Sequence, residues 1–229
     1  MDIEFWNQRW ENNQIGFHQQ KVNPYLSYFY GTKGMDPARR SALKVFVPLC
    51  GKSLDLLWLA QNGYAVLGVE CSDRAVDNFF SENGLNYQSV KKHDYAFYRH
   101  TGQLADIEIY QGDFFALQPE DFSGISDVFD RAALIALPED MRRSYVNKMA
   151  ELQQPGTRTL LVTLTYDQSE MAGPPFSVSE AEVNRLYAKD FQVEKLLYKD
   201  TLEQEAHFKA KGLTALTETV YKLKRKTST

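Results

Sequence analysis

The sequence has little of what several protein classes require. Its 229 residues include only two cysteines, Cys50 and Cys71, so a disulfide framework is excluded and we expect reduced thiols. The formal net charge of -4 does not provide the concentrated basic surface that nucleic-acid binding needs. No apolar run approaches the roughly 18 residues of a membrane span. We therefore expect no nucleic-acid partner and no membrane partner.

Targeting and metal-binding patterns are also missing. The first residues, MDIEFWNQRWENN, carry early acids and no basic region followed by an apolar stretch, so they are unlike a signal peptide and a cytoplasmic location is expected. The four histidines, at positions 18, 93, 100 and 207, have neither ligand spacing nor an evident partner for proton transfer. We expect no metal site and no pair of nucleophile and base.

Two nucleotide-binding motifs are incomplete. Gly51-Lys52-Ser53 resembles the end of a phosphate-binding loop, but a Walker A motif needs a glycine where this chain has Phe46. The dinucleotide fingerprint fails as well, because the segment from Pro48 to Gly51 offers a single glycine. An NTPase is disfavoured, and an NAD-dependent oxidoreductase remains only as an alternative.

What is present is a regular alternation of strands and helices. Short β-branched runs alternate with helical patterns, which is typical of βαβ units and of a doubly wound α/β sheet. Strands are expected at residues 43–47, 64–69, 107–110, 127–129 and 159–165. Ser53 and Ser72 are expected to cap the helices that follow the first two strands. Pro138 is expected to open a later helix.

The two ends of the chain depart from this alternation. The strand-like runs at 191–198 and 213–223 are separated by too few residues for a crossover helix, so they should pair antiparallel. Residues 1–42 carry aromatic side chains at helical spacing and predict a helical N-terminal segment. Residues 86–105 predict a small surface hairpin. The length fits a single domain over 1–229, with residues 43–229 as its ligand-binding core.

Polar residues at the strand ends suggest a nucleoside cofactor. Glu70 ends the second strand 19 positions after Gly51, where an acid in this topology accepts ribose hydroxyl groups. Asp113 and Phe114 follow the third strand and suit an adenine ring through a polar contact and stacking. The alternatives are a hydrated loop carboxylate for Glu70 and a simple turn with a core phenylalanine for Asp113 and Phe114.

Arg131 ends the fourth strand, at the edge where open α/β sheets bind ligands. Its guanidinium suits an anionic or carboxylate-bearing substrate. A structural ion pair with Asp130 or Asp127 is the alternative. Pro174-Pro175-Phe176 follows the fifth strand, and we expect it to form a rigid turn and one wall of an acceptor pocket. After it, Ser179-x-x-Glu182 is expected to form a capping box at the start of the next helix.

Six motifs together resemble those of a known family. They are Trp6-x-x-x-Trp10, GFHQ (16–19), VPLCGKSLD (47–55), Gly68-Val69-Glu70, DRAALIAL (130–137) and GPPF (173–176). On these motifs, and over nearly its whole length, the chain resembles thiopurine S-methyltransferases. The segment VPLCGKSLD followed by Gly-Val-Glu is the specific part of the resemblance.

The resemblance implies a Rossmann-like class I methyltransferase fold, with a mostly parallel seven-stranded sheet, helices on both faces and a C-terminal antiparallel pair. It implies S-adenosylmethionine as cofactor and S-adenosylhomocysteine as product. Cofactor contacts would come from Trp10, Leu49, Gly51, Glu70, Asp113, Phe114 and Arg131. Acceptor contacts would come from Phe17, His18, Arg131 and Pro175, with residues 1–42 as a lid.

Two positions depart from the family pattern. Asp113 stands where some members carry a small hydroxyl residue, so a backbone contact to adenine is expected there more than a side-chain contact. Residues 207–209 stand where some members carry a substrate-facing arginine, which leaves the identity of the acceptor open.

Methyl transfer from a sulfonium is an in-line displacement, which requires alignment and exclusion of water. Aromatic residues such as Trp10 and Phe17 suit both tasks. An acidic thiol is largely anionic near neutral pH, so no catalytic base is assigned and Arg131 orients the anion. The resemblance implies an enzyme that methylates small aromatic or heterocyclic thiols, and we expect it to be a monomer. Selenium or tellurium compounds as natural acceptors and a non-catalytic S-adenosylmethionine-binding module are the alternatives.

Overall fold

The computed structural model describes residues 3–31, 42–92, 95–104 and 106–227. The chain divides into two compact units, residues 1–128 and 129–229. No helix in the described ranges is long and apolar enough to cross a membrane.

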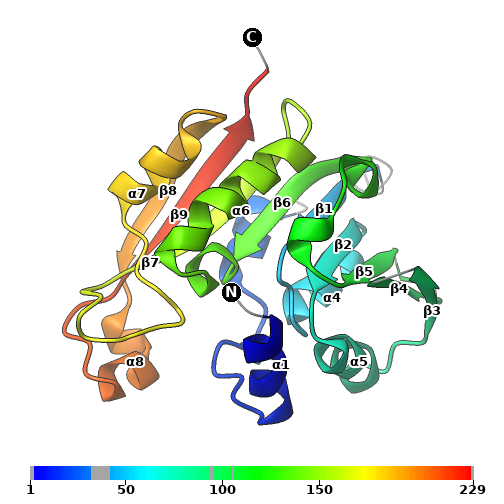
Figure 1. Ribbon diagram of the computed structural model, residues 1–229, viewed down its shortest axis with the longest axis horizontal. Helices are drawn as coiled ribbons and strands as arrows, with labels where there is room; N and C mark the ends of the chain where they lie inside the picture. The colour runs from blue at the N-terminus through cyan, green and yellow to red at the C-terminus, as the bar shows by residue number, and fades with distance from the viewer. Residues whose placement is uncertain (1–2, 32–41, 93–94, 105, 228–229) are drawn as a thin grey trace. The chain divides into compact units, whose positions relative to one another are not determined.

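The first unit contains the parallel strands predicted from the sequence. They are β1 (Lys44–Val47), β2 (Ala65–Glu70), β5 (Ile107–Gln111) and β6 (Ile125–Arg131), the last of which continues into the second unit. β2 pairs parallel with both β1 and β5, and β1 pairs parallel with β6. The strand order of this unit is β3-β4-β5-β2-β1-β6 (Figure 1).

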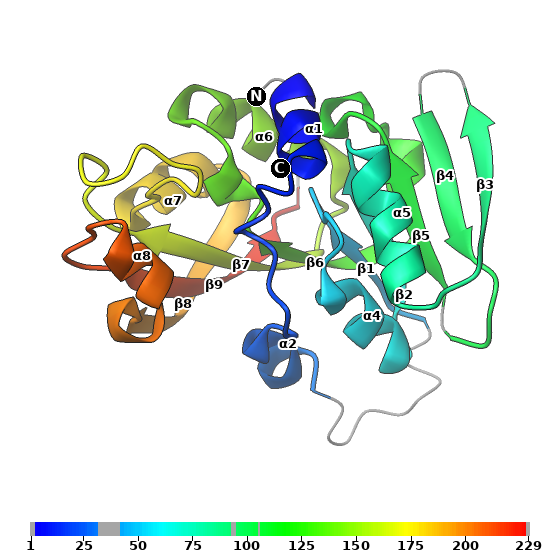
Figure 2. The same cartoon turned by 90° about the horizontal axis from the view of Figure 1, so that it is seen from below.

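The hairpin expected at residues 86–105 is present but belongs to the sheet. β3 (Tyr87–Lys92) and β4 (Tyr95–His100) pair antiparallel, and β4 also pairs antiparallel with β5, as Figure 2 shows. Phe97 lies opposite Tyr110, and their rings meet edge to face at 5.3 Å. These strands raise the number in the described part of the chain to nine, so the expected count of seven is wrong. Residues 93, 94 and 105 lie outside that part.

Two expected helices follow the first strands. Ser53 caps α4 (Leu54–Gln61) by accepting from the Asp55 amide, and Ser72 caps α5 (Asp73–Glu82) by accepting from the Ala75 amide. Both helices pack against β2. The short helices η1 (Phe114–Ala116) and η2 (Pro119–Phe122) follow β5.

The N-terminal segment is helical, as predicted. It contains α1 (Ile3–Glu11), which packs against α5, and α2 (Pro24–Phe29), which Asn23 caps through the Tyr25 amide. Residues 1, 2 and 32–41 of the expected lid lie outside the described ranges.

The second unit carries the antiparallel strands. β7 (Arg158–Thr165), β9 (Thr217–Arg225) and β8 (Phe191–Asp200) pair antiparallel in that order, which confirms the predicted final pair. β9 begins later than expected, because Leu213 and Leu216 instead pack in a buried cluster with Tyr166. The helical elements are η3 (Leu134–Ala136), α6 (Glu139–Leu152), α7 (Glu180–Tyr187), η4 (Leu202–Gln204) and α8 (Ala206–Ala210). α7 contacts α6 and β8.

Candidate functional site

The turn after β1 has an unusual backbone and a close neighbour. Leu49 and Gly51 both adopt the left-handed region, with φ of 45° and 52°. The Cys50 amide donates to the carbonyl of Val69 at 2.9 Å, which fastens the turn to β2. A β-carbon on Gly51 would lie 3.0 Å from the Trp10 ring. Glycine at this position therefore allows Trp10, which is buried, to lie directly against the backbone.

Glu70 presents a buried carboxylate to the same turn. One oxygen, Oε2, accepts from the Gly51 amide at 2.8 Å, and Oε1 accepts from the Ser72 amide at 2.9 Å. Burial raises the pKa of Glu70, while the bonds from the Ser72 and Gly51 amides lower it. The structure thus brings Trp10 of α1 together with Gly51, in the turn after β1, and with Glu70, at the end of β2. These three residues are 19 or more positions apart in the sequence.

The third strand end adjoins this carboxylate through the backbone. The Gly112 amide donates to the carbonyl of Glu70 at 2.9 Å. Asp113 is exposed, and its Oδ1 accepts from the Phe115 amide at 2.9 Å, so its side chain caps η1. Phe114 is buried, and its ring meets that of Phe115 edge to face. These contacts match the alternative of a simple turn followed by a core phenylalanine, and the backbone bonded to Glu70 is that of Gly112, the residue before Asp113.

An aromatic cluster surrounds Phe17. Its ring meets those of Trp6 and Trp10 edge to face, with centroids 5.4 Å and 5.5 Å apart. His18 follows it, is partly buried, and donates its amide to the carbonyl of Ile15 at 2.8 Å. Phe17 is therefore connected through Trp10 to the Gly51 turn.

Lys52 has a structural partner. Its Nζ donates to both carboxylate oxygens of Glu82, at 2.7 Å and 2.9 Å. Each residue of Gly51-Lys52-Ser53 therefore has a structural contact: Gly51 with Glu70, Lys52 with Glu82, and Ser53 as a helix cap.

In the second unit, Arg131 ends β6 beside a buried acid. Asp130 accepts from the Tyr145 hydroxyl at 2.8 Å and from the Leu134 amide at 3.2 Å. Burial raises the pKa of Asp130 to about 6, against the opposing effect of these two hydrogen bonds. Ala132 has a φ of 64°, so the chain turns sharply after Arg131.

The GPPF segment forms a tight turn in the second unit. The peptide bonds before Pro174 and Pro175 are cis, and Gly173 has a φ of 80° with the Phe176 ring against it. The Tyr166 hydroxyl donates to the carbonyl of Pro175 at 2.6 Å. Beyond the turn, Ser179 caps α7 through the Glu182 amide. The other bond of the expected capping box, from the Ser179 amide to the Glu182 carboxylate, is wrong. The Glu182 carboxylate accepts from Arg142 instead.

Residues 207–209, one of the two places where the sequence departs from the motifs it resembles, lie on α8. The His207 ring packs against Phe208 with centroids 3.9 Å apart. Lys209 pairs with Glu203 at 2.6 Å. Phe208 is buried in the cluster that includes Tyr166.

A family model described as thiopurine S-methyltransferase matches residues 1–226. The chain belongs to the thiopurine S-methyltransferase family. A relative of that name from Pseudomonas fluorescens is 48% identical over 98% of this chain and 99% of its own. Another from Azotobacter vinelandii is 46% identical over 99% of this chain and 100% of its own.

Solved structures support the fold of this family member. An S-adenosylmethionine-dependent methyltransferase from Anabaena variabilis has a TM-score of 0.62 at 14% identity, covering 98% of this chain and 95% of its own. A Burkholderia thailandensis 1,6-didemethyltoxoflavin-N1-methyltransferase with bound S-adenosylhomocysteine has a TM-score of 0.63 at 12% identity, covering 98% and 87%. The chain has the class I methyltransferase fold and is an S-adenosylmethionine-dependent methyltransferase.

The first unit fits this cofactor. Glu70 Oε1 accepts from the Ser72 amide and from the Cys71 thiol, whereas Oε2 accepts from the Gly51 amide, so acceptor capacity for a hydroxyl donor such as that of ribose remains at Oε2. At Gly51 the absent β-carbon leaves room for the Trp10 ring, whose nearest atom lies 3.0 Å from the position that a β-carbon would take. A buried carboxylate beside a glycine turn and an aromatic ring suits the ribose and the cationic sulfur of such a cofactor.

Arg142 was not predicted from the sequence as a site residue, although it contacts several segments of the second unit. It is 3% exposed, and its guanidinium donates to the carbonyl of Leu137, the last residue of DRAALIAL, and to the carbonyl of Ser177, which directly follows GPPF. Its position in the sequence could have indicated its burial, because Arg142 shares one face of α6 with Tyr145, Val146 and Met149 at helical spacing. An arginine on an apolar helical face needs a partner that only the folded chain supplies.

Proposed function

We propose that this protein transfers a methyl group from S-adenosylmethionine to the sulfur of small aromatic or heterocyclic thiols, including thiopurines. The observation that carries the proposal is the similarity, at 46% to 48% identity over almost the full length, to relatives named for that reaction. The cofactor supplies an electrophilic methyl group on a sulfonium. An arylthiol is acidic enough to be largely a thiolate near neutral pH, so the nucleophile needs no catalytic base.

We assign the first unit the task of holding the cofactor. Glu70 accepts hydrogen bonds from the ribose hydroxyls, and Leu49 and Gly51 allow close approach to the backbone. Trp10 contacts the cationic end with its ring face. The Asp113 backbone and Phe114 serve the adenine. The burial of Glu70 and its two amide bonds support this assignment, because they fix the carboxylate in one orientation.

We assign acceptor contacts to Phe17, His18, Arg131 and Pro175. Arg131 attracts and orients the thiolate, and its guanidinium also suits the carboxylate of S-adenosylmethionine. Phe17 excludes water with its ring, and its contacts with both tryptophans support a fixed orientation. Pro175 forms a rigid wall, which its bond from Tyr166 supports. The rate of methyl transfer then depends on the alignment of thiolate and methyl group and on the exclusion of water, and not on proton transfer.

An acceptor screen with methyl-labelled S-adenosylmethionine tests the proposal. The panel contains a thiopurine, a thiophenol, an aliphatic thiol, selenite and tellurite, with an aromatic amine as the control acceptor. We expect rapid labelling of the thiopurine and thiophenol at a neutral pH above the pKa of each thiol. The aliphatic thiol should react slowly because it is mostly protonated there. Faster methylation of the selenium or tellurium compounds, or none of any thiol, would contradict the proposal.

We also propose that the protein works as a cytoplasmic monomer and as one methyltransferase domain. The two free cysteines support a reducing compartment, and a single family model that spans both units supports one domain. Cell fractionation and light scattering at micromolar concentration test the location and the monomer.

A further inference from the structure

The GPPF turn is held at successive backbone groups by residues around it. The Tyr166 hydroxyl donates to the carbonyl of Pro175 at 2.6 Å, and the Phe176 amide donates to the carbonyl of Ile135 at 2.7 Å. Gln168 Oε1 accepts from the next amide, that of Ser177, at 2.9 Å. The turn therefore has little freedom to shift by itself.

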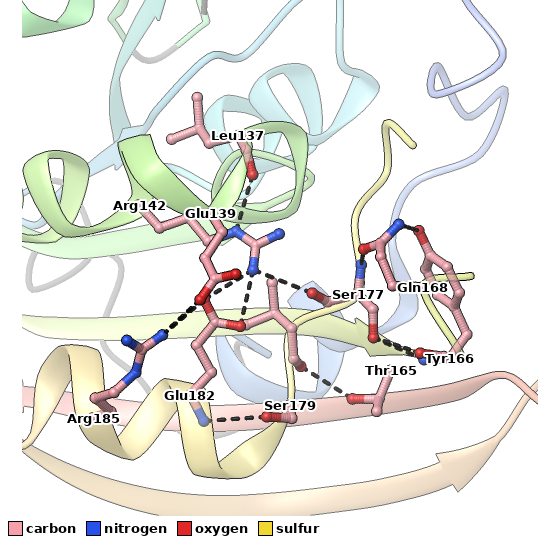
Figure 3. Close-up of polar contacts among 11 residues, drawn as sticks. Leu137, Glu139, Arg142, Thr165, Tyr166, Gln168, Ser177, Ser179, Glu182 and Arg185 are labelled. Carbon is pink, nitrogen blue, oxygen red and sulfur yellow. Dashed lines mark hydrogen bonds and ion pairs between the residues drawn. The ribbon is translucent and has the colours of Figure 1, made fainter. Parts of the chain in front are cut away.

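One guanidinium joins this turn to the segment that carries Arg131. Figure 3 shows Arg142 between the two: Nε donates to the carbonyl of Leu137 at 2.9 Å, and Nη1 donates to the carbonyl of Ser177 at 3.2 Å. Leu137 ends the motif DRAALIAL, and Ser177 directly follows GPPF. Arg142 thus bridges the two segments to which we assign acceptor contacts in this unit.

The charge of Arg142 is compensated at the same place. Nη1 also donates to both carboxylate oxygens of Glu182, at 2.8 Å and 2.9 Å, and the guanidinium carbon lies 5.8 Å from the Phe176 ring centroid. A planar guanidinium donates in several fixed directions at once, which a lysine ammonium on a flexible chain does not reproduce. The bridge therefore depends on arginine and not only on positive charge.

Tyr166 is oriented at both ends of its side chain. Its ring belongs to the buried cluster with Phe208 and Leu216, and its hydroxyl accepts from Gln168 Nε2 at 3.2 Å (Figure 3). Its backbone carbonyl accepts from the Ser177 hydroxyl at 2.7 Å. The hydroxyl that holds Pro175 is therefore fixed by packing as well as by hydrogen bonds.

We propose that Arg142 and Tyr166 are positioning residues that set the separation between the Arg131 segment and the Pro175 turn, and thereby the selectivity among acceptors of different size. The inference rests on the proposed function, because it takes Arg131 and Pro175 as acceptor contacts. Neither residue reacts. Each acts by fixing a wall of the acceptor site, so its loss changes which acceptors fit before it changes the methyl transfer itself.

The test uses Tyr166→Phe, which keeps the ring, and Arg142→Lys, which keeps the charge. For each variant, kcat and KM are measured with a thiophenol and with a bicyclic thiopurine, and the Kd of S-adenosylhomocysteine is measured by calorimetry. We expect the KM ratio of the two acceptors to change about three- to tenfold, the scale of one lost hydrogen bond. The Kd of S-adenosylhomocysteine should stay within about twofold, below the scale of one lost hydrogen bond.

Arg143→Lys is the matched control. Arg143 lies on the same helix and donates to the carbonyls of Leu186 and Arg185 at 3.0 Å and 2.9 Å, so it holds backbone elsewhere. We expect the KM ratio of the two acceptors in Arg143→Lys to equal that of the wild type. If Arg142→Lys does not fold, Tyr166→Phe decides the question alone.

The possible results distinguish a failure of the positioning role from a failure of the proposed function. A purely structural role would lower kcat for both acceptors equally and leave both KM values unchanged, which would overturn the positioning role. If the wild type methylates thiols and both variants keep its KM ratio of the two acceptors, only the positioning role is overturned. A wild type that methylates no thiol would overturn both proposals.

Discussion

At the scale of single residues, Glu70 is a buried carboxylate whose desolvation is partly offset by hydrogen bonds that also fix its orientation. Removing a carboxylate from water is costly, and amide donors offset part of that cost. Here the Gly51 and Ser72 amides supply them. The same bonds fix the orientation of the two oxygens, so a ligand that brings further hydroxyl donors meets acceptors already in place.

The first prediction concerns this carboxylate. Glu70→Gln places an amide NH2 group against the Gly51 or Ser72 amide and removes the charge that strengthens hydrogen bonds from hydroxyl groups. We expect the affinity for S-adenosylhomocysteine, measured by calorimetry, to fall about 10- to 100-fold. Glu82→Gln is the control, because that carboxylate pairs with Lys52. Equal affinities of the two variants would show that Glu70 does not bind the cofactor.

The second prediction concerns pH and Asp130. Its pKa is raised from 3.8 to about 6 by burial, so the folded protein binds more protons than the unfolded chain between these values. The contribution of Asp130 to stability is therefore fully present below about pH 4 and is lost as the pH rises through 6. Asp130→Asn should remove this pH dependence of the free energy of unfolding, which amounts to about 3 kcal/mol between pH 4 and pH 6.

Urea unfolding of both proteins at several values between pH 4 and pH 7 measures the effect. Other groups, including Glu70 with its raised pKa, contribute to both curves, so the difference between the curves isolates Asp130. A difference that stays constant with pH would contradict the raised pKa of Asp130.

At the scale of elements, the sequence predicted what local chemistry determines. Ser53 and Ser72 cap their helices as expected, because the hydroxyl of a capping residue acts within its own turn. The role of Glu182 was wrong for the complementary reason. Its spacing from Ser179 specifies a capping box, but a buried arginine on another helix competes for the carboxylate. Local patterns do not contain such a partner.

The third prediction tests the turn after β1. Gly51→Ala carries two penalties, a left-handed φ of 52° and a β-carbon 3.0 Å from the Trp10 ring. Gly124→Ala is the matched control in the same unit, since it has a φ of 78° and nothing within 4 Å. We expect each substitution to cost about 1 kcal/mol through the backbone. Gly51→Ala alone should also weaken S-adenosylhomocysteine binding, because the ring of Trp10 must move.

Calorimetric affinity and urea unfolding of both variants provide the comparison. An unchanged affinity in Gly51→Ala would mean that Trp10 does not contact the cofactor.

At the scale of the whole molecule, the alternation of strands and helices was enough to predict the α/β class, the parallel core and the final antiparallel pair. The strand count was wrong, because the hairpin of β3 and β4 could have stood apart or joined the sheet. That choice depends on contacts such as Phe97 with Tyr110, which pairing register creates. Arg142 was missed for a related reason, since its partners lie on residues 5, 35 and 40 positions away.

The last prediction treats the folded chain as one ligand-binding system. A ligand that binds only the native state stabilises it by about 2.7 kcal/mol at 100 times its Kd. For a protein of this length, each kcal/mol shifts the melting temperature by about 2 to 4 °C. S-adenosylmethionine at that concentration should therefore raise the melting temperature by about 5 to 10 °C. NAD at the same concentration should leave it unchanged, because the turn with the single glycine Gly51 lacks a pyrophosphate cradle.

Differential scanning fluorimetry measures both shifts. Glu70→Gln should lose most of the shift with S-adenosylmethionine, and Glu82→Gln should retain it. A larger shift with NAD than with S-adenosylmethionine would contradict the cofactor assignment. Loss of the shift in both variants would instead point to an effect of net charge, because the two substitutions change the charge equally and differ in whether the carboxylate is buried beside Gly51 or paired with Lys52 at the surface.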